Sequence, residues 1–168
     1  MPIVDSFLQE LEQEAATTRR VLERVPNDKL DWRPHPKSMS LGQLAQHVAT
    51  TPGQIAAMVT GASFALPAEF PSPPSAASTE ELLKAFEADI AQAKDTLSNW
   101  DDAHATAEWT VTNASGKTLM QMPRVGFIRV IALNHWYHHR GQLSVYLRLL
   151  DVPLPSIYGP SADENPFA

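Results

Sequence analysis

The sequence predicts an all-α fold, a four-helix bundle, in a single domain over residues 1–168. Three observations indicate this class. Apolar residues recur at three- and four-residue steps in four long segments, which is the spacing of one face of an α-helix. Two of these segments begin with a capping-box pattern. The chain is also long enough to bury one sizeable core.

The first helix is expected over residues 4–25, where the apolar residues follow helical steps up to Pro26. Residues 28–38 contain two further prolines and are expected to connect the first helix to the second. Trp32 lies within this connection, and we expect it to pack down on the bundle.

The second helix is expected to start at Ser40, because Ser40 followed by Gln43 is a capping-box pattern. This start places His47 about two turns inside the helix, at the border of its apolar stripe. Pro52 lies in the same helical pattern and is expected to kink the helix just past His47.

Residues 61–78 contain four prolines and no helical period, so a long loop is expected there. Phe64, Leu66 and Phe70 indicate that this loop packs on another part of the protein. Loops of this length are often functional covers, and the sequence leaves open whether this one is a lid at the rim of a site or a plain connector.

The third helix is expected from Ser78, where Glu81 completes a second capping-box pattern, to Trp100. Residues 108–112 are β-prone, and a turn separates them from a return segment at 117–120. A short hairpin is the most that this pattern predicts.

The fourth helix is expected from Pro123 to about Leu150, followed by a non-helical tail with four prolines that lies across the bundle. Residues 127–133 are apolar on nearly all sides, so this helix is either central or covered by a second subunit. Gly141 costs about 1 kcal/mol relative to alanine in mid-helix, which indicates close approach of another backbone.

The fourth helix also carries His135, His138 and His139. Residues four apart stand one above the other on a helix, so His135 and His139 can direct ring nitrogens at one point. A stripe from Ile128 to Leu150 is expected to carry them inward. His138 is the alternate to His139. The H-E-x-x-H class of metalloprotease is excluded because Trp136, and not glutamate, follows the first histidine.

A third ligand is needed because catalytic zinc-type centres usually take three protein groups, and His47 is the candidate. His35 and His104 lie in a turn and a polar connection, without a regular face to present. The alternative is that each histidine is an ordinary buried or surface residue with its own partner. Unpaired buried polar groups cost about 1–3 kcal/mol each, and a shared cation would satisfy all three.

The composition excludes several kinds of chemistry and argues against several kinds of binding partner. The chain has no cysteine, which excludes disulfides, thiolate metal sites and a cysteine nucleophile. Its formal charge of -6 argues against nucleic acid or an anionic membrane as partner. Without a signal-like N-terminus or an apolar run of about 18 residues, a soluble cytoplasmic protein is expected.

Three blocks of the sequence resemble the DinB family of the DinB/YfiT-like metalloenzymes. They are residues 41–47 (LGQLAQH), 135–143 (HWYHHRGQL) and 157–164 (IYGPSADE), and the resemblance extends over almost the whole chain. It implies an up-down-down-up four-helix bundle, frequently a homodimer, with one divalent metal ion on His47, His135 and His139. In this fold, relatives with known activity use low-molecular-weight thiols, and others have been assigned as metal-dependent hydrolases.

Two functions follow as hypotheses. The first is a metal-dependent enzyme of thiol-transferase or hydrolase type, in which the cation activates water or a low-molecular-weight thiol against a small-molecule substrate. Gln142 and Tyr146 are candidate substrate contacts, with core or interhelical bonding as the alternative for each; for Arg140 a salt bridge is favoured. The second hypothesis is a non-catalytic, metal-stabilised bundle with a structural or stress-response role. Zn or Ni is the expected metal, with Fe, Mn or Cu as alternatives.

Overall fold

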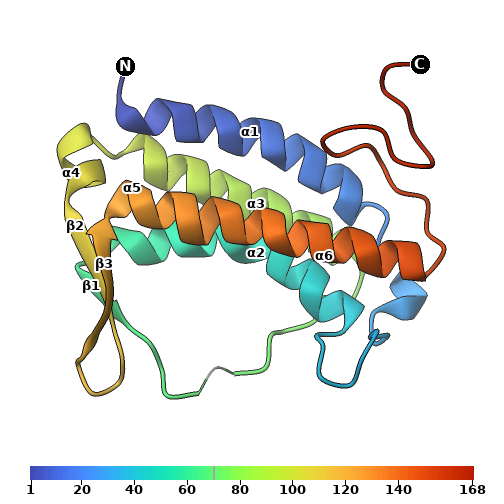
Figure 1. Cartoon of the computed structure of the whole chain (residues 1–168), viewed down its shortest axis with the longest axis horizontal. Helices are drawn as coiled ribbons and strands as arrows, with labels where there is room; N and C mark the ends of the chain where they lie inside the picture. Colours follow the sequence, from blue (N-terminus) through green and yellow to red (C-terminus); the bar gives the residue numbers. More distant parts are fainter. Residues whose placement is uncertain (70) are drawn as a thin grey trace.

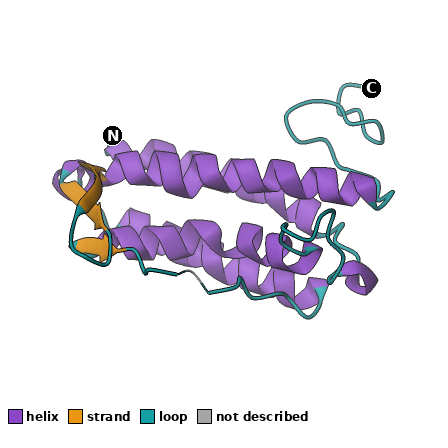
Figure 2. Cartoon of the chain, turned by 60° about the horizontal axis from the view of Figure 1, so that its bottom comes forward, coloured by secondary structure: helices purple, strands orange, loops and turns teal. Residues whose placement is uncertain are grey.

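The computed structural model describes residues 1–69 and 71–168. In this part of the chain, four helices of at least 15 residues lie side by side (Figures 1 and 2). The N-terminal and C-terminal members run in one direction, and the two between them run in the other (Figure 1). The four are α1 (Ile3–Leu22), α2 (Leu41–Thr60), α3 (Thr79–Ser98) and α6 (His135–Leu149).

Both predicted helix starts are confirmed by their caps. The Ser40 side chain accepts a hydrogen bond from the backbone of Gln43 at 3.2 Å, and the Gln43 side chain accepts one from the backbone of Ser40 at 2.9 Å. At α3 the Ser78 side chain accepts from the backbone of Glu81 at 3.1 Å. These bonds satisfy N–H groups that have no partner inside a helix. The start of α2, and with it the position of His47 along the helix, is therefore determined by local hydrogen bonds.

The all-α expectation is wrong, because a three-stranded sheet lies at one end of the long helices (Figure 1). The predicted hairpin is present as β2 (Glu108–Thr112) paired antiparallel with β3 (Thr118–Pro123). In addition, β1 (Ser63–Ala65) pairs in parallel with β2. A strand of three residues is too short to show an alternating pattern, and so the sequence did not reveal it.

The rest of the predicted 61–78 loop runs from this sheet back to α3 (Figure 1). Phe64 packs on the core, as predicted, and the Gln43 side chain donates to the backbone oxygen of Pro73 at 3.1 Å. The packing expected of Phe70 lies outside the described residues. The loop is thus held near both of its ends.

The polar connection expected after the third helix contains a short helix, α4 (Asp102–Thr106). The Asp101 side chain accepts from the backbone of His104 at 2.7 Å and caps it. Trp32, in the connection before α2, is half-buried against the core as predicted.

The expected fourth helix is divided into three parts: α5 (Arg124–Phe127), the π-helical segment η2 (Ile128–Asn134) and α6. A π-helix bonds each residue to the fifth along the chain, so its faces do not follow the usual spacing. The expected inward stripe is present only in part: its two histidines meet His47 between the helices, but Gln142 is exposed. The buried face of α6 carries Trp136, Arg140, Leu143 and Leu147, and the two histidines lie half-buried beside it.

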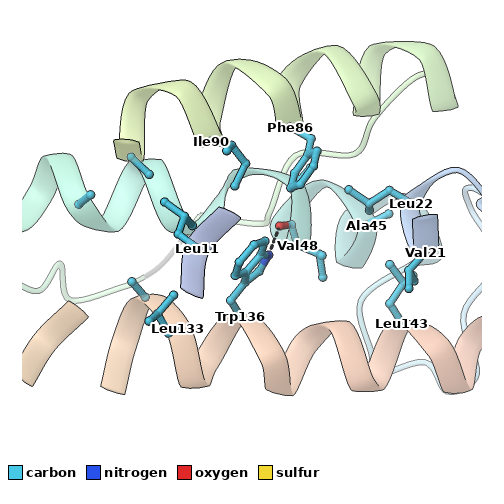
Figure 3. Packing of buried hydrophobic residues seen from close by; sticks show 14 of the residues in the cluster. Leu11, Val21, Leu22, Ala45, Val48, Phe86, Ile90, Leu133, Trp136 and Leu143 are labelled. Atoms are coloured by element: carbon cyan, nitrogen blue, oxygen red, sulfur yellow. Dashed lines mark hydrogen bonds between the residues drawn. The ribbon is translucent and has the colours of Figure 1, made fainter. Parts of the chain in front are cut away.

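Trp136 is the central side chain of the core. It is fully buried and extends from α6 between residues of the other three long helices, including Leu11, Val48 and Phe86 (Figure 3). Its ring centroid lies 6.4 Å from that of Phe86 on α3. Burying an aromatic side chain of this size contributes strongly to stability.

Helix α2 continues through Pro52 and is bent along its length (Figure 1). The next two backbone N–H groups, of Gly53 and Gln54, donate to the two carboxylate oxygens of Asp89 at 2.7 and 3.1 Å. A Cβ on Gly53 would lie 2.3 Å from the Asp89 backbone oxygen, so this close approach of α3 requires glycine. Burial raises the pKa of Asp89 to about 6, although the two N–H bonds act in the opposite direction.

None of the helices in the described residues has both the length and the apolar content needed to span a bilayer.

Candidate metal centre

Three histidines from two helices converge on one point. His47 comes from the second turn of α2, and His135 and His139 come from the first two turns of α6. The Nε2 atoms of His47 and His135 are 3.0 Å apart. One ligand nitrogen from each of the three rings lies within 4.8 Å of the others. The structure therefore brings together the three residues that the sequence singled out.

The separation of the nitrogens fits a shared cation. Zinc binds imidazole nitrogen at about 2.0–2.1 Å, which places two such nitrogens roughly 3.3 Å apart at a tetrahedral angle and roughly 2.9 Å apart at a right angle. The observed 3.0 Å lies within this range. A chain without cysteine provides only nitrogen and oxygen ligands, and three imidazoles suit a borderline-soft divalent metal.

The protonation state of the cluster also fits a cation. Burial, with a smaller effect from His139 and His135, lowers the pKa of His47 to about 4. The pKa values of His135 and His139 are lowered as well, in both cases mainly by burial. All three rings are therefore neutral at pH 7, and only a neutral imidazole has a lone pair available for a metal.

Gln142 fixes the orientation of one ring. Its side-chain oxygen lies 2.7 Å from Nδ1 of His139. Since an amide oxygen only accepts hydrogen bonds, Nδ1 carries the proton and Nε2 is left with its lone pair. Partners of this kind orient metal-binding histidines and raise their basicity. The sequence marked Gln142 as a candidate substrate contact, which stays a prediction; its contact with His139 was missed.

Tyr146, the other candidate substrate contact, has partners on a neighbouring segment. Its hydroxyl lies 3.4 Å from the backbone oxygen of Met39, and its ring meets that of Trp32 edge-on with centroids 5.7 Å apart. These contacts join α6 to the connection before α2 and correspond to the core alternative. A role for Tyr146 in substrate binding stays a prediction.

The remaining histidines lie outside the cluster. His138, the alternate ligand, is exposed and does not contribute to the converging nitrogens. His35 accepts a hydrogen bond from the backbone of Lys37 within its own turn. His104 packs beside Trp100, with ring centroids 4.9 Å apart. Of the six histidines, only three share a site in the part of the chain that is described.

Arg140 lies on the buried face of α6 and is 1% exposed. The predicted salt bridge is confirmed: its Nη1 lies 2.6 Å from Oε2 of Glu14 on α1. Its Nη2 donates at 2.5 Å to the hydroxyl of Tyr158, in the C-terminal tail. The tail contains no helix or strand, as predicted. These long-range partners, which anchor α6 beside His139, left no local signal in the sequence.

The cluster is only partly buried. Each of the three histidines is only half-buried. No further histidine, aspartate or glutamate from residues 1–69 or 71–168 joins the group. An ion held by three protein ligands retains positions for small molecules, whereas structural zinc sites are closed by four.

Fold and site together define a mainly helical protein with three converging imidazoles between two of its helices. The chain belongs to the DinB family, whose model matches residues 1–165. It is 32% identical over 162 residues to the uncharacterized protein YrdA of Bacillus subtilis strain 168, covering 96% of this chain and 91% of that protein.

Two solved structures show the same fold. A DinB-like protein from Bacillus cereus ATCC 10987 superposes with a TM-score of 0.70 at 26% identity, covering 92% of this chain and 97% of the other. A DinB-like protein from Bacillus subtilis superposes with a TM-score of 0.67 at 18% identity, covering 90% and 96%.

Proposed function

We propose that this protein is a metal-dependent enzyme of the thiol-transferase or hydrolase type. In this proposal, His47, His135 and His139 hold one divalent cation, with zinc or nickel expected. The observation that carries the proposal is the pair of Nε2 atoms, 3.0 Å apart, on neutral rings from two helices. Without a cation, two adjacent lone pairs repel each other unless one ring presents a proton.

The openness of the cluster supports catalysis over a purely structural role. A bound divalent cation would lower the pKa of water to about 7 and would deprotonate a thiol. The chain's own contribution is to keep the three rings neutral, to orient His139 through Gln142 and to leave the three ligands only half-buried. A separate general base is then unnecessary, and a small molecule can approach from the half-exposed side.

Metal analysis tests the binding part of this proposal. Protein purified without a histidine tag is expected to contain close to one equivalent of a divalent metal by mass spectrometry. His47→Ala and His139→Ala should lose this metal, because two imidazoles do not form a tight site. His138→Ala is the matched control, since His138 is exposed and outside the cluster. Full retention of metal in the His47→Ala and His139→Ala proteins would refute the site.

An activity panel tests the catalytic part. The metal-loaded protein is incubated with low-molecular-weight thiols plus electrophiles, and separately with simple esters and amides. Turnover that disappears in His139→Ala but persists in His138→Ala is the expected result. If the wild-type protein binds metal and turns over nothing in the panel, the non-catalytic, metal-stabilised bundle becomes the better description.

We also propose that the protein forms a homodimer through the outer face of α6. Val145 is 57% exposed and Leu149, one turn further, is 59% exposed. Gly141 stands one turn before Val145, and no described atom lies within 4 Å of the position that a Cβ would occupy there. The close approach that the sequence predicted at Gly141 is therefore not made by the described part of the chain. A second copy would cover this apolar face.

A further inference from the structure

Pro52 removes one hydrogen bond from the interior of α2. In an α-helix the backbone N–H of residue 52 would donate to the carbonyl oxygen of residue 48, but proline has no N–H. The Val48 carbonyl is therefore left without its helical donor in the middle of the core. A buried carbonyl in this position requires another partner.

That partner is Trp136. Its indole Nε1 donates to the Val48 carbonyl oxygen at 2.8 Å, and both residues are fully buried (Figure 3). This bond crosses from α6 to α2. Both side chains are 0% exposed, so the bond is shielded from solvent by the side chains that form it.

The bond lies directly beside the histidine cluster in both helices. Val48 follows His47 along α2, and Trp136 follows His135 along α6. The two residues that the bond joins are thus the chain neighbours of the two histidines whose Nε2 atoms are 3.0 Å apart. Sliding or rotation of α6 against α2 would break the bond and separate these nitrogens together.

The interrupted turn of α2 is held on its other side as well. The Thr51 hydroxyl donates to the His47 carbonyl oxygen at 2.6 Å. Beyond the proline, Gly53 and Gln54 donate to Asp89 of α3. Helix α3 thus binds the N–H groups that follow Pro52, and α6 binds the Val48 carbonyl that precedes it. The backbone that bears His47 is therefore held by both neighbouring helices.

We propose that Trp136 is a positioning residue for the metal centre, and that Pro52 creates the acceptor through which it acts. Trp136 sets the register of α6 against α2 so that the nitrogens of His47 and His135 meet at one cation. The role in metal binding rests on the proposed function. The register itself is a property of the chain and can be tested without metal.

The test compares Trp136→Phe with Trp109→Phe. Each variant replaces a fully buried indole with a smaller aromatic ring. Trp136 loses a hydrogen bond, whereas the indole nitrogen of Trp109 has no partner within the described residues. Trp109→Phe therefore controls for lost volume. Partners that orient ligands typically change metal affinity by about 10–100-fold, and we expect a weakening of about tenfold for Co²⁺ in Trp136→Phe and little change in Trp109→Phe.

Two further measurements do not depend on affinity. The visible spectrum of bound Co²⁺ should change in Trp136→Phe and not in Trp109→Phe, since it reports the geometry of the ligands. In metal-free protein, the NMR cross-relaxation between the rings of His47 and His135 should weaken in Trp136→Phe alone. An unchanged cross-relaxation signal in Trp136→Phe would overturn the inference, whatever the metal does.

Pro52→Ala tests the route through the Val48 carbonyl. An alanine at this position supplies the missing N–H, so the carbonyl no longer depends on Trp136. In the Pro52→Ala background, Trp136→Phe should therefore cost clearly less Co²⁺ affinity than in the wild-type background. Equal costs in the two backgrounds would refute the proposed route. A wild-type protein that binds no Co²⁺, but whose ring contact still depends on Trp136, would refute the metal centre and leave the positioning role standing.

Discussion

At the scale of single residues, the main feature of the histidine cluster is that its ring nitrogens are partly shielded from water. The rings of His47, His135 and His139 are partly desolvated, so they stay neutral and their nitrogens need partners. Gln142 supplies one such partner, at Nδ1 of His139. A neutral imidazole carries a proton on only one of its two nitrogens. A hydrogen bond that keeps this proton on Nδ1 therefore leaves the lone pair of Nε2 free to bind a metal.

Replacing Gln142 should therefore weaken metal binding without removing a ligand. Gln142→Leu removes the acceptor for Nδ1, and the dissociation constant for Zn²⁺ is expected to rise about 10–100-fold in a competition titration. Gln142→Glu keeps an acceptor oxygen and should retain binding close to that of the wild-type protein. Equal affinity in the leucine and wild-type proteins would show that Gln142 does not orient the ring.

At the scale of helices, the two interruptions of regular structure both lie next to the cluster. The π-helical segment η2 ends at Asn134, immediately before His135, and Pro52 removes one backbone hydrogen bond from α2 between one and two turns after His47. Each changes the direction in which the following or preceding turn faces. Asp89 stabilises the second interruption, because its carboxylate accepts the N–H groups of Gly53 and Gln54.

Asp89→Asn should destabilise the protein while keeping the size of the side chain. An amide has one oxygen and a donor group, so one of the two backbone N–H groups loses its acceptor. The lost acceptor lowers stability, whereas removal of the buried charge raises it, so the expected loss in the free energy of unfolding is at most about 1 kcal/mol, measured by urea denaturation at pH 7. Asp95→Asn on the exposed face of α3 is the control and should leave stability nearly unchanged.

Asp89 also predicts a pH dependence with a definite sign. Its pKa is about 6 in the folded protein, against an ordinary value of 3.8 for a solvated aspartate, so the folded state holds the proton more tightly between these values. The contribution of Asp89 to stability is therefore largest below about pH 4 and decreases as the pH rises to about 6. The free energy of unfolding of the Asp89→Asn protein should lack this pH dependence between about pH 4 and about pH 6. A wild-type and a variant protein with parallel pH profiles would contradict it.

At the scale of the whole molecule, the exposed apolar face of α6 lies on the same helix as two of the three histidines. Arg140 and the tail residue Tyr158 fix the opposite side of this helix to α1. The outer face has no such cover in the described chain, and the proposed dimer would bury it.

Val145→Glu is expected to convert the proposed dimer to a monomer, because it places a charge at the centre of the apolar face. Leu119→Glu, at an exposed leucine on β3, is the matched control and should leave the dimer intact. Light scattering coupled to size-exclusion chromatography gives the mass directly. A wild-type protein that elutes as a monomer would exclude this assembly.

The sequence by itself determined the helix starts, the spacing of His135 and His139 and the choice of His47, because caps and helical periodicity are local properties. Resemblance to a family placed the three histidines in one site. Only the tertiary structure decided that Gln142 orients His139, that Arg140 is buried against Glu14 and that Trp136 bonds to Val48. It also showed the π-helical segment and the short strand β1. These features depend on which segments meet in space, and no local pattern specifies a partner more than 80 residues away along the chain, as Val48 is from Trp136.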